Sequence, residues 1–304
     1  SLPCSRKLVH KLGLDVSPGA LFRTSGFFKG ANAKGEPLGK TLSVHLKYAF
    51  QFGPDTRFGR NFPFTYQGVG VAYNTFFNSA EIGTPAALYV FQHARIVSLT
   101  DALSLDYEWN LGVSFGWKRY DAESNPFNTV VGSNVNAYIN LGLMFNWRFA
   151  PQWNLTAGVG LTHFSNGNTR YPNGGVNLIG GRVGVMRTFG REASGDRRTQ
   201  MRRSDPFEPY VSYDLILYGA LRKKGFILSE QTFLIPGSFG VAGLNFTPMY
   251  NFSRFFRAGL SLDAQYDESA NLKDHIANDN LWMDEIKFHR PPFMLSLIHI
   301  SEPT

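Results

Sequence analysis

The sequence alternates between apolar and polar residues over runs that are longer than most strands of soluble proteins. From 103 to 118, the odd positions are large and apolar, whereas the even positions are hydrophilic or small. The same pattern returns in 135–148 and in 256–267. A period of two is typical of a β-strand with one face in an apolar environment. Ordinary strands have about 5–6 residues, so these longer runs favour tilted membrane strands.

The composition of the two faces separates a membrane barrel from a soluble β-sandwich. Aromatic residues lie near both ends of the apolar face, Tyr107 and Trp109 at one end and Phe115 and Trp117 at the other. Membrane barrels carry such aromatic girdles at both interfaces. The opposite face is rich in Gly, Ser and Asn, which would make a poor packed core and is typical of a barrel lumen. We therefore predict an all-β fold, an antiparallel transmembrane β-barrel.

The pattern predicts about eleven strands. They are expected in 19–28, 40–51, 67–77, 86–99, 103–119, 135–149, 153–165, 176–189, 209–221, 238–251 and 254–267. Single-chain bacterial barrels have an even strand number, so we expect about 12 strands, with the C-terminal closing strand missing from this chain. The expected organisation is an N-terminal segment (1–18), the barrel (19–267), an irregular or outer-loop segment (268–294) and a tail (295–304) that resembles translated sequencing adaptor instead of native protein.

The composition argues against several other classes of protein. A single cysteine, Cys4, allows neither an internal disulfide nor a Cys-rich zinc module. The histidines show no pair at metal-ligand spacing, so no metal and no cofactor are expected. The net charge of +7 comes without long basic blocks, so no nucleic-acid partner is expected. Residues 112–116 match the G-x-S-x-G motif, but that motif needs a strand-turn-helix junction, so Ser114 is expected to face the lumen.

A polar pair ends the apolar stripe of the strand expected at 153–165. His163 and Ser165 occupy the same odd positions as the apolar residues before them, so both are expected to face lipid. An imidazole two residues from a hydroxyl on one strand face can act as its general base. The strand starts after a short turn and therefore runs outward. A rise of about 3.3 Å per residue and a tilt of about 40° place His163 roughly 25 Å along, near the outer-leaflet headgroups.

The next strand and the loop before it offer groups that could complete a catalytic site. Asn177 has the parity of the apolar face of the strand expected at 176–189, so its side chain could lie beside His163. The loop 166–175 is rich in groups that can donate hydrogen bonds to a developing oxyanion.

These residues resemble the lipid A 3-O-deacylase family (PagL type, acyloxyacyl hydrolases), outer-membrane β-barrel esterases that remove an ester-linked acyl chain from lipopolysaccharide. The resemblance is carried by His163-Phe164-Ser165-Asn166, by Pro172-Asn173-Gly174-Gly175 and by position 177. It implies that Ser165 is the nucleophile and His163 the base, and that Asn166, Gly167 and Asn173 form the oxyanion site. The best-known members carry a glutamate where this chain has Asn177. An amide can orient the imidazole, but it adds no negative charge to stabilise the imidazolium.

The resemblance implies a carboxylic ester hydrolase of the bacterial outer membrane, with lipid A or lipopolysaccharide as its substrate and membrane lipid around it. A signal peptide is expected to be missing from this sequence. Lys118, Arg119 and Arg170 fall near the predicted outer rim, where they are either solvated or bound to lipid A phosphates.

Two alternatives stay open at this point. One is a non-enzymatic barrel, a pore or a structural protein, whose site has degenerated because Asn177 replaces the acidic residue. The other is an outer-membrane phospholipase, since the ester chemistry would be identical and only the recognition of the headgroup would differ.

Overall fold

The computed structural model describes residues 8–53, 56–189, 207–228, 231–234, 237–253, 256–269 and 293–303. The chain divides into two compact units. One consists of Ser1–Gly167 and Pro172–Asp205, the other of Asn168–Tyr171 and Pro206–Thr304. No helix within these described ranges has the length and the apolar run that a bilayer crossing needs.

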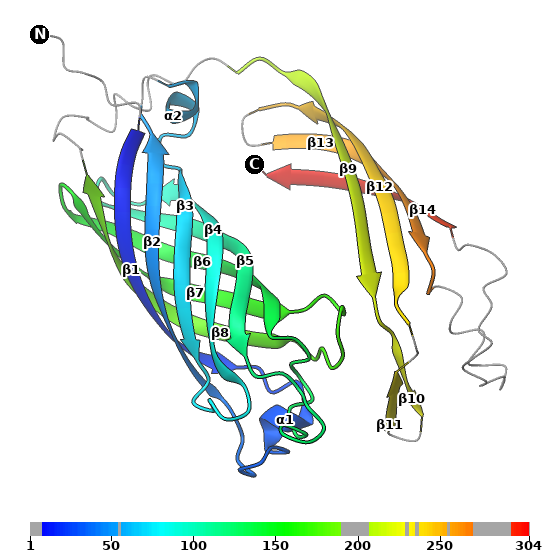
Figure 1. Cartoon of the computed structure of the whole chain (residues 1–304). Helices are drawn as coiled ribbons and strands as arrows, with labels where there is room; N and C mark the ends of the chain where they lie inside the picture. The colour runs from blue at the N-terminus through cyan, green and yellow to red at the C-terminus, as the bar shows by residue number, and fades with distance from the viewer. Residues whose placement is uncertain are drawn as a thin grey trace, which may run out of the picture. The chain divides into compact units, whose positions relative to one another are not determined.

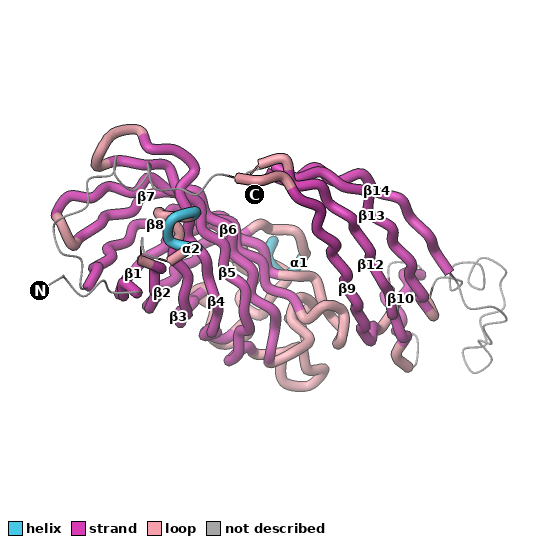
Figure 2. The backbone as a smooth tube through the Cα atoms, turned by 90° about the horizontal axis from the view of Figure 1, so that it is seen from above, coloured by secondary structure: helices cyan, strands magenta, loops and turns pink. Residues whose placement is uncertain are grey.

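Eight antiparallel strands form a closed barrel in the first unit (Figure 1). They are β1 (Leu8–Leu21), β2 (Lys40–Phe52), β3 (Tyr66–Thr75), β4 (Gly83–Ser98), β5 (Leu103–Trp117), β6 (Val135–Ala150), β7 (Trp153–Ser165) and β8 (Val176–Phe189). Two short helices, α1 (Gly26–Lys29) and α2 (Arg57–Asn61), lie in loops at opposite ends of the barrel (Figure 1). Figure 2 shows how little of the backbone these helices occupy compared with the strands.

The expected strand number of about 12 is wrong, because eight strands already close the barrel. Strand β1 pairs with β2 on one side and with β8 on the other, and the second pairing runs from His10 opposite Phe189 to Leu21 opposite Leu178. The barrel strands thus span 8–189, whereas the barrel was expected at 19–267.

Strand β1 lies mostly in the segment that was expected to precede the barrel. Its sequence nevertheless alternates. Leu12 and Leu14 face outward and are 46% and 48% exposed, whereas Lys11 and Asp15 face inward and are 6% and 2% exposed. The strand expected at 19–28 shares only residues 19–21 with β1, and α1 begins at Gly26, so that expected strand is wrong. The strands expected from 40–51 to 176–189 are β2 to β8, with ends that differ by a few residues. Those expected at 209–221, 238–251 and 254–267 are strands too, but they belong to a separate sheet and not to the barrel.

Strand β6 shows the two faces of the wall most regularly. Its odd residues lie outside, where Ile139 and Leu141 are 46% and 57% exposed. Its even residues point inward, where Tyr138 and Asn140 are 1% and 3% exposed. Since a strand directs successive side chains to opposite faces, the barrel has an apolar outer surface and a mixed interior, as the alternation predicts.

Charged side chains fill part of this interior. The Lys47 ammonium lies 2.5 Å from Asp15 and 2.9 Å from Glu108, and the Arg182 guanidinium lies 2.7 Å from Glu108. The four side chains are at most 3% exposed. Buried charges are tolerated only when they are paired, so each of these groups depends on the others. The interior of an eight-stranded barrel is just wide enough for side chains to fill it.

Aromatic side chains pack the interior beside the functional segment. Phe164 is 1% exposed, and its ring centroid lies 5.0 Å from that of Trp117 and 5.4 Å from that of Tyr138. Trp117 was expected in the outer girdle but is 4% exposed. The register between β4 and β5 shifts near this end, and Gly116 has a φ of +90°. Such an irregularity turns the following side chain to the other face of the strand.

The second unit contains a four-stranded sheet and a small hairpin. The sheet has the order β14–β13–β12–β9, and the hairpin joins β10 to β11. Their bounds are β9 (Tyr210–Arg222), β10 (Gly225–Leu228), β11 (Gln231–Leu234), β12 (Phe239–Asn251), β13 (Phe256–Asp267) and β14 (Phe293–Pro303). Most of the expected irregular segment 268–294 lies outside the described residues. The expected tail 295–304 falls largely on β14, and its non-native origin stays a prediction.

Replacing Glu108 tests the buried ion pairs. Glu108→Ala leaves Lys47 and Arg182 buried around the single carboxylate of Asp15. We expect the free energy of unfolding of the refolded barrel to fall by about 3–5 kcal/mol, because breaking a buried pair leaves a charge without compensation. Urea titration in detergent measures this change. Glu123→Ala, in an exposed loop position, is the control and should change stability by less than about 0.5 kcal/mol; equal effects of the two substitutions would contradict the assignment.

Candidate functional site

His163 and Ser165 lie at the outer end of β7 and on its outward-facing side. Both are half-buried, whereas Phe164 between them is buried in the interior. Their neighbours across the strand pair β6–β7 are Ile139, opposite His163, and Ala137, opposite Ser165. The two polar side chains therefore belong to the apolar outer surface of the barrel, as their parity predicts.

Asn177 of β8 lies directly opposite His163 in the register of β7 and β8. The imidazole Nδ1 of His163 and the amide Oδ1 of Asn177 are 2.6 Å apart. An amide oxygen can only accept a hydrogen bond. The proton of the imidazole is therefore on Nδ1, and this N–H donates the hydrogen bond to Asn177. The remaining ring nitrogen, Nε2, then has a lone pair and can act as a base. The structure thus brings these two predicted residues together.

The hydroxyl of Ser165 is on the same face as the imidazole, but no hydrogen bond joins His163 to Ser165 within the described part of the chain. Residues i and i+2 of a strand are neighbours on one face, so a rotation of either side chain can bring them together. Catalytic hydrogen bonds of this kind are often loose before substrate binds.

The loop 166–175 begins with a sharp turn. Gly167 and Asn168 have φ values of +62° and +61°, a left-handed region that glycine and asparagine tolerate best. The backbone N–H of Asn166 donates to Oδ1 of Asn173 at 3.2 Å, so the two asparagines of the expected oxyanion site are linked across the loop. Gly167 follows directly and is exposed.

Gly175 makes the closest backbone approach to the imidazole. Its φ is +67°, and a Cβ added there would lie 3.3 Å from Cε1 of His163. Only glycine meets both conditions without strain. The Gly-Gly pair at 174–175 was part of the resemblance, but its role against the imidazole was not predicted, because the sequence does not show which glycine has a positive φ.

The three basic residues expected to bind phosphate are divided between the two units. Lys118 and Arg119 follow the end of β5 in the first unit and are exposed. Arg170 is also exposed but belongs to Asn168–Tyr171, which groups with the second unit. Near the first two, the backbone and hydroxyl of Ser124 and the backbone of Glu123 donate hydrogen bonds to Asp121 and hold the pKa of this carboxyl below its usual value.

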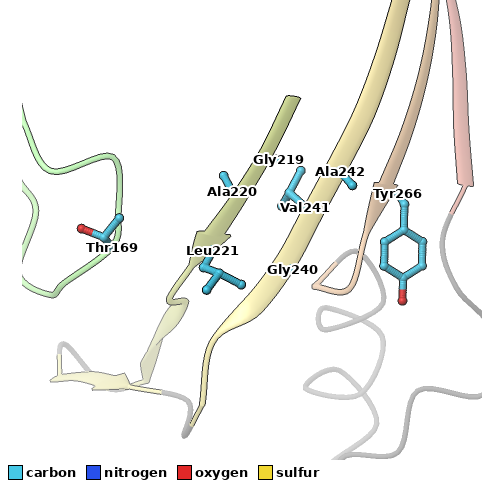
Figure 3. Close-up of a pocket in the computed structure, with 8 residues that line it drawn as sticks. All are labelled: Thr169, Gly219, Ala220, Leu221, Gly240, Val241, Ala242 and Tyr266. Atoms are coloured by element: carbon cyan, nitrogen blue, oxygen red, sulfur yellow. The ribbon is translucent and has the colours of Figure 1, made fainter. Parts of the chain in front are cut away.

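The described residues that line a cavity of about 540 Å³ belong to the second unit, Thr169 of the loop 166–175 among them (Figure 3). Small or apolar side chains of β9 and β12 line most of it, and the polar side chains among its described lining residues are those of Thr169 and Tyr266. This lining contains no pair of nucleophile and base, so the outer end of β7 remains the candidate site.

A substitution at Gly175 tests the close approach to His163. Gly175→Ala should lower the free energy of unfolding by about 1–3 kcal/mol, because alanine at this φ is strained and its methyl group presses on the imidazole. Gly181→Ala in the following strand, β8, is the control, since no atom lies within 4 Å of an added Cβ there. Thermal or urea unfolding compares the two variants; a Gly175→Ala protein as stable as the control would show that the strain is absent.

Two family models match this chain. Residues 90–186 match the model for lipid A 3-O-deacylase (PagL), and residues 211–298 match the model for the C-terminal domain of acyloxyacyl hydrolase. The first match contains His163, Ser165 and Asn177. A search of curated proteins found no match.

Several solved structures match this chain at low sequence identity. Neisserial surface protein A is 10% identical with a TM-score of 0.39, and the match covers 61% of this chain and 99% of that chain. The outer membrane enzyme PagL is 14% identical with a TM-score of 0.35, over 57% of this chain and 97% of that chain. The N-terminal barrel domain of Pseudomonas aeruginosa OprF is 9% identical with a TM-score of 0.33, over 58% and 96%.

The matched families and the closed antiparallel barrel agree on the location of the protein, which is the bacterial outer membrane. The hydrolase domain coincides with the strands that carry the outward-facing polar residues, and the C-terminal domain coincides with the sheet of the second unit. The chain thus contains one segment similar to each of the two family models, and its resemblance to the lipid A 3-O-deacylase family is confirmed.

Proposed function

We propose that this protein is an outer-membrane serine esterase that hydrolyses an ester-linked acyl chain of lipid A. The observation that carries this proposal is the 2.6 Å contact between His163 Nδ1 and Asn177 Oδ1 on the outer face of the barrel, two residues from Ser165. A base whose tautomer is fixed, beside a hydroxyl, is the arrangement that nucleophilic catalysis on an ester needs. Its place on the apolar surface suits a substrate whose acyl chains lie in the membrane.

In the proposed reaction, Ser165 Oγ attacks the carbonyl carbon of the ester. His163 Nε2 takes the hydroxyl proton as the C–O bond forms, and its Nδ1–H remains bonded to Asn177. Collapse of the tetrahedral intermediate breaks the bond to the sugar oxygen, which receives the proton from His163. Water then attacks the acyl-enzyme by the same route, and the fatty acid leaves.

The charge that develops on the carbonyl oxygen needs hydrogen-bond donors. Asn166, Gly167 and Asn173 are proposed to supply them. The backbone N–H of Asn166 is already committed to Asn173 Oδ1, so the donors proposed for the oxyanion are the side-chain amides and the N–H of Gly167. The bond between the two asparagines supports this role, because it fixes how Asn173 presents its amide.

Lys118, Arg119 and Arg170 are proposed to bind the phosphates of the headgroup by charge-assisted hydrogen bonds. All three side chains are exposed and are therefore accessible to a headgroup.

The packed interior argues against the pore alternative. Ion pairs among Lys47, Glu108 and Arg182, together with the aromatic cluster around Phe164, occupy the lumen in which a pore would need water. The phospholipase alternative uses the same nucleophile and base, so the choice of substrate has to be measured.

The substitution Ser165→Ala tests the nucleophile. We expect the variant to insert normally and to lose fatty-acid release from lipopolysaccharide by at least about a thousandfold, because the covalent route is removed. Mass spectrometry of lipid A before and after incubation measures the loss of one acyl group, and phospholipid vesicles serve as the competing substrate. Equal release by the variant and the parent protein would rule out Ser165. Release from the phospholipid alone would support a phospholipase.

The substitution Asn177→Asp tests the missing negative charge. The aspartate has the same shape as Asn177 and keeps the acceptor of the 2.6 Å bond, while its charge stabilises the imidazolium that forms during attack. We expect kcat to rise about tenfold near neutral pH. Asn177→Leu, which has no acceptor, should lower kcat below that of the parent. A decrease of kcat in Asn177→Asp would contradict the assigned role of this side chain.

A further inference from the structure

Asn128 is the most completely bonded side chain among the described outer loops near the site. It lies in the loop between β5 and β6 and is 0% exposed. Its amide nitrogen donates to the backbone carbonyls of Glu81 and Lys118, each at 2.8 Å. Its Oδ1 accepts from the backbone N–H groups of Val130 and Val131, at 3.2 and 3.1 Å. Every hydrogen-bonding position of this amide is used.

The segment that Asn128 holds is the one against which the site loop rests. The backbone N–H of Gly174 donates to the carbonyl of Val130 at 3.0 Å, and Val131 forms an isolated bridge with Asn173. Val130 and Val131 are 2% and 4% exposed. Asn173 in turn accepts the hydrogen bond from the backbone of Asn166. A continuous chain of contacts thus leads from Asn128 to the two asparagines of the proposed oxyanion site.

The other side of Asn128 is firmly anchored. The carboxylate of Glu81, whose backbone carbonyl Asn128 binds, is 6% exposed. It accepts hydrogen bonds from the backbone of Ala33 at 2.9 Å and from the side chain of Asn78 at 2.8 Å. Ala33 belongs to the loop between β1 and β2, and Asn78 to the loop between β3 and β4. Asn128 therefore connects the site loop to the other outer loops of the barrel.

We propose that Asn128 is a positioning residue for the oxyanion site, because it fixes the Val130–Val131 segment that holds Asn173 and Gly174. This inference rests on the proposed function. It assigns Asn128 no contact with substrate. Loss of Asn128 should therefore lower kcat and leave KM nearly unchanged, since misplaced oxyanion donors weaken the binding of the intermediate more than that of the ester.

Asn125 is a matched control in the same loop. Its amide nitrogen also donates to the carbonyl of Glu81, at 2.8 Å, and to that of Arg119, at 3.0 Å. It is nearly as buried, at 9% exposed, but its side-chain bonds run to Glu81 and Arg119 instead of to Val130 and Val131. Replacing it removes a similar anchor without releasing the segment behind the site.

The experiment compares Asn128→Ala and Asn125→Ala in the refolded full chain, by kinetics of fatty-acid release from lipopolysaccharide and by amide hydrogen exchange. For Asn128→Ala we expect a decrease in kcat of at least about tenfold with KM unchanged within about twofold, and exchange at Gly174 about tenfold faster. For Asn125→Ala we expect kcat and the exchange at Gly174 to stay within about twofold of the parent.

Equal effects of the two substitutions on kcat, or a lower kcat without faster exchange at Gly174, would overturn the proposal. If Asn128→Ala does not fold, Asn128→Asp takes its place. It keeps an acceptor for Val130 and Val131 but loses both donors, and its carboxylate faces the carbonyls of Glu81 and Lys118, so exchange at Gly174 should again be faster than in the parent; unchanged exchange there together with a lower kcat would overturn the proposal. If the parent protein releases no fatty acid, the proposed function fails, while the exchange measurement still tests whether Asn128 fixes the loop.

Discussion

Closure of the sheet is the constraint on which the rest of this structure depends. In lipid, every backbone N–H and C=O must find a partner within the protein, and the pairing of β1 with β8 satisfies this requirement without leaving an edge. Once the wall is closed, the position of a residue in its strand decides whether the side chain meets lipid or the lumen. His163 and Asn177 face the same side because they lie opposite each other in adjacent strands. The register between β7 and β8 thus brings the two residues together.

The interior supports this outer site from behind. Phe164 points inward between His163 and Ser165, and its contacts with Trp117 and Tyr138 hold this end of β7 in place. The polar residues outside therefore sit on a segment whose inner side chain is locked by packing. A functional site that is supported in this way keeps its geometry better than one carried by a loop alone.

The sequence predicts most strands of the barrel wall and the two central residues of the candidate site. Alternation locates β2 to β8 because their outer stripes are continuous, and parity places His163 and Ser165 outside. It misses most of β1, although Lys11 and Asp15 point inward there as the alternation requires. It cannot show the roles of Gly175 or Asn128 either, since these depend on a backbone dihedral angle and on contacts between loops distant in the sequence.

The filled lumen limits the routes by which a substrate can reach the site and a product can leave it. With Lys47, Glu108 and Arg182 locked together inside the barrel, neither reactant nor product has a route along its axis. Under the proposed function, a lipid that reaches Ser165 would have to arrive sideways within the leaflet, and the released fatty acid would have to leave into the same leaflet. Turnover would then depend on membrane fluidity and crowding, so stiff, tightly cross-bridged lipopolysaccharide would slow the protein without any change in its own atoms.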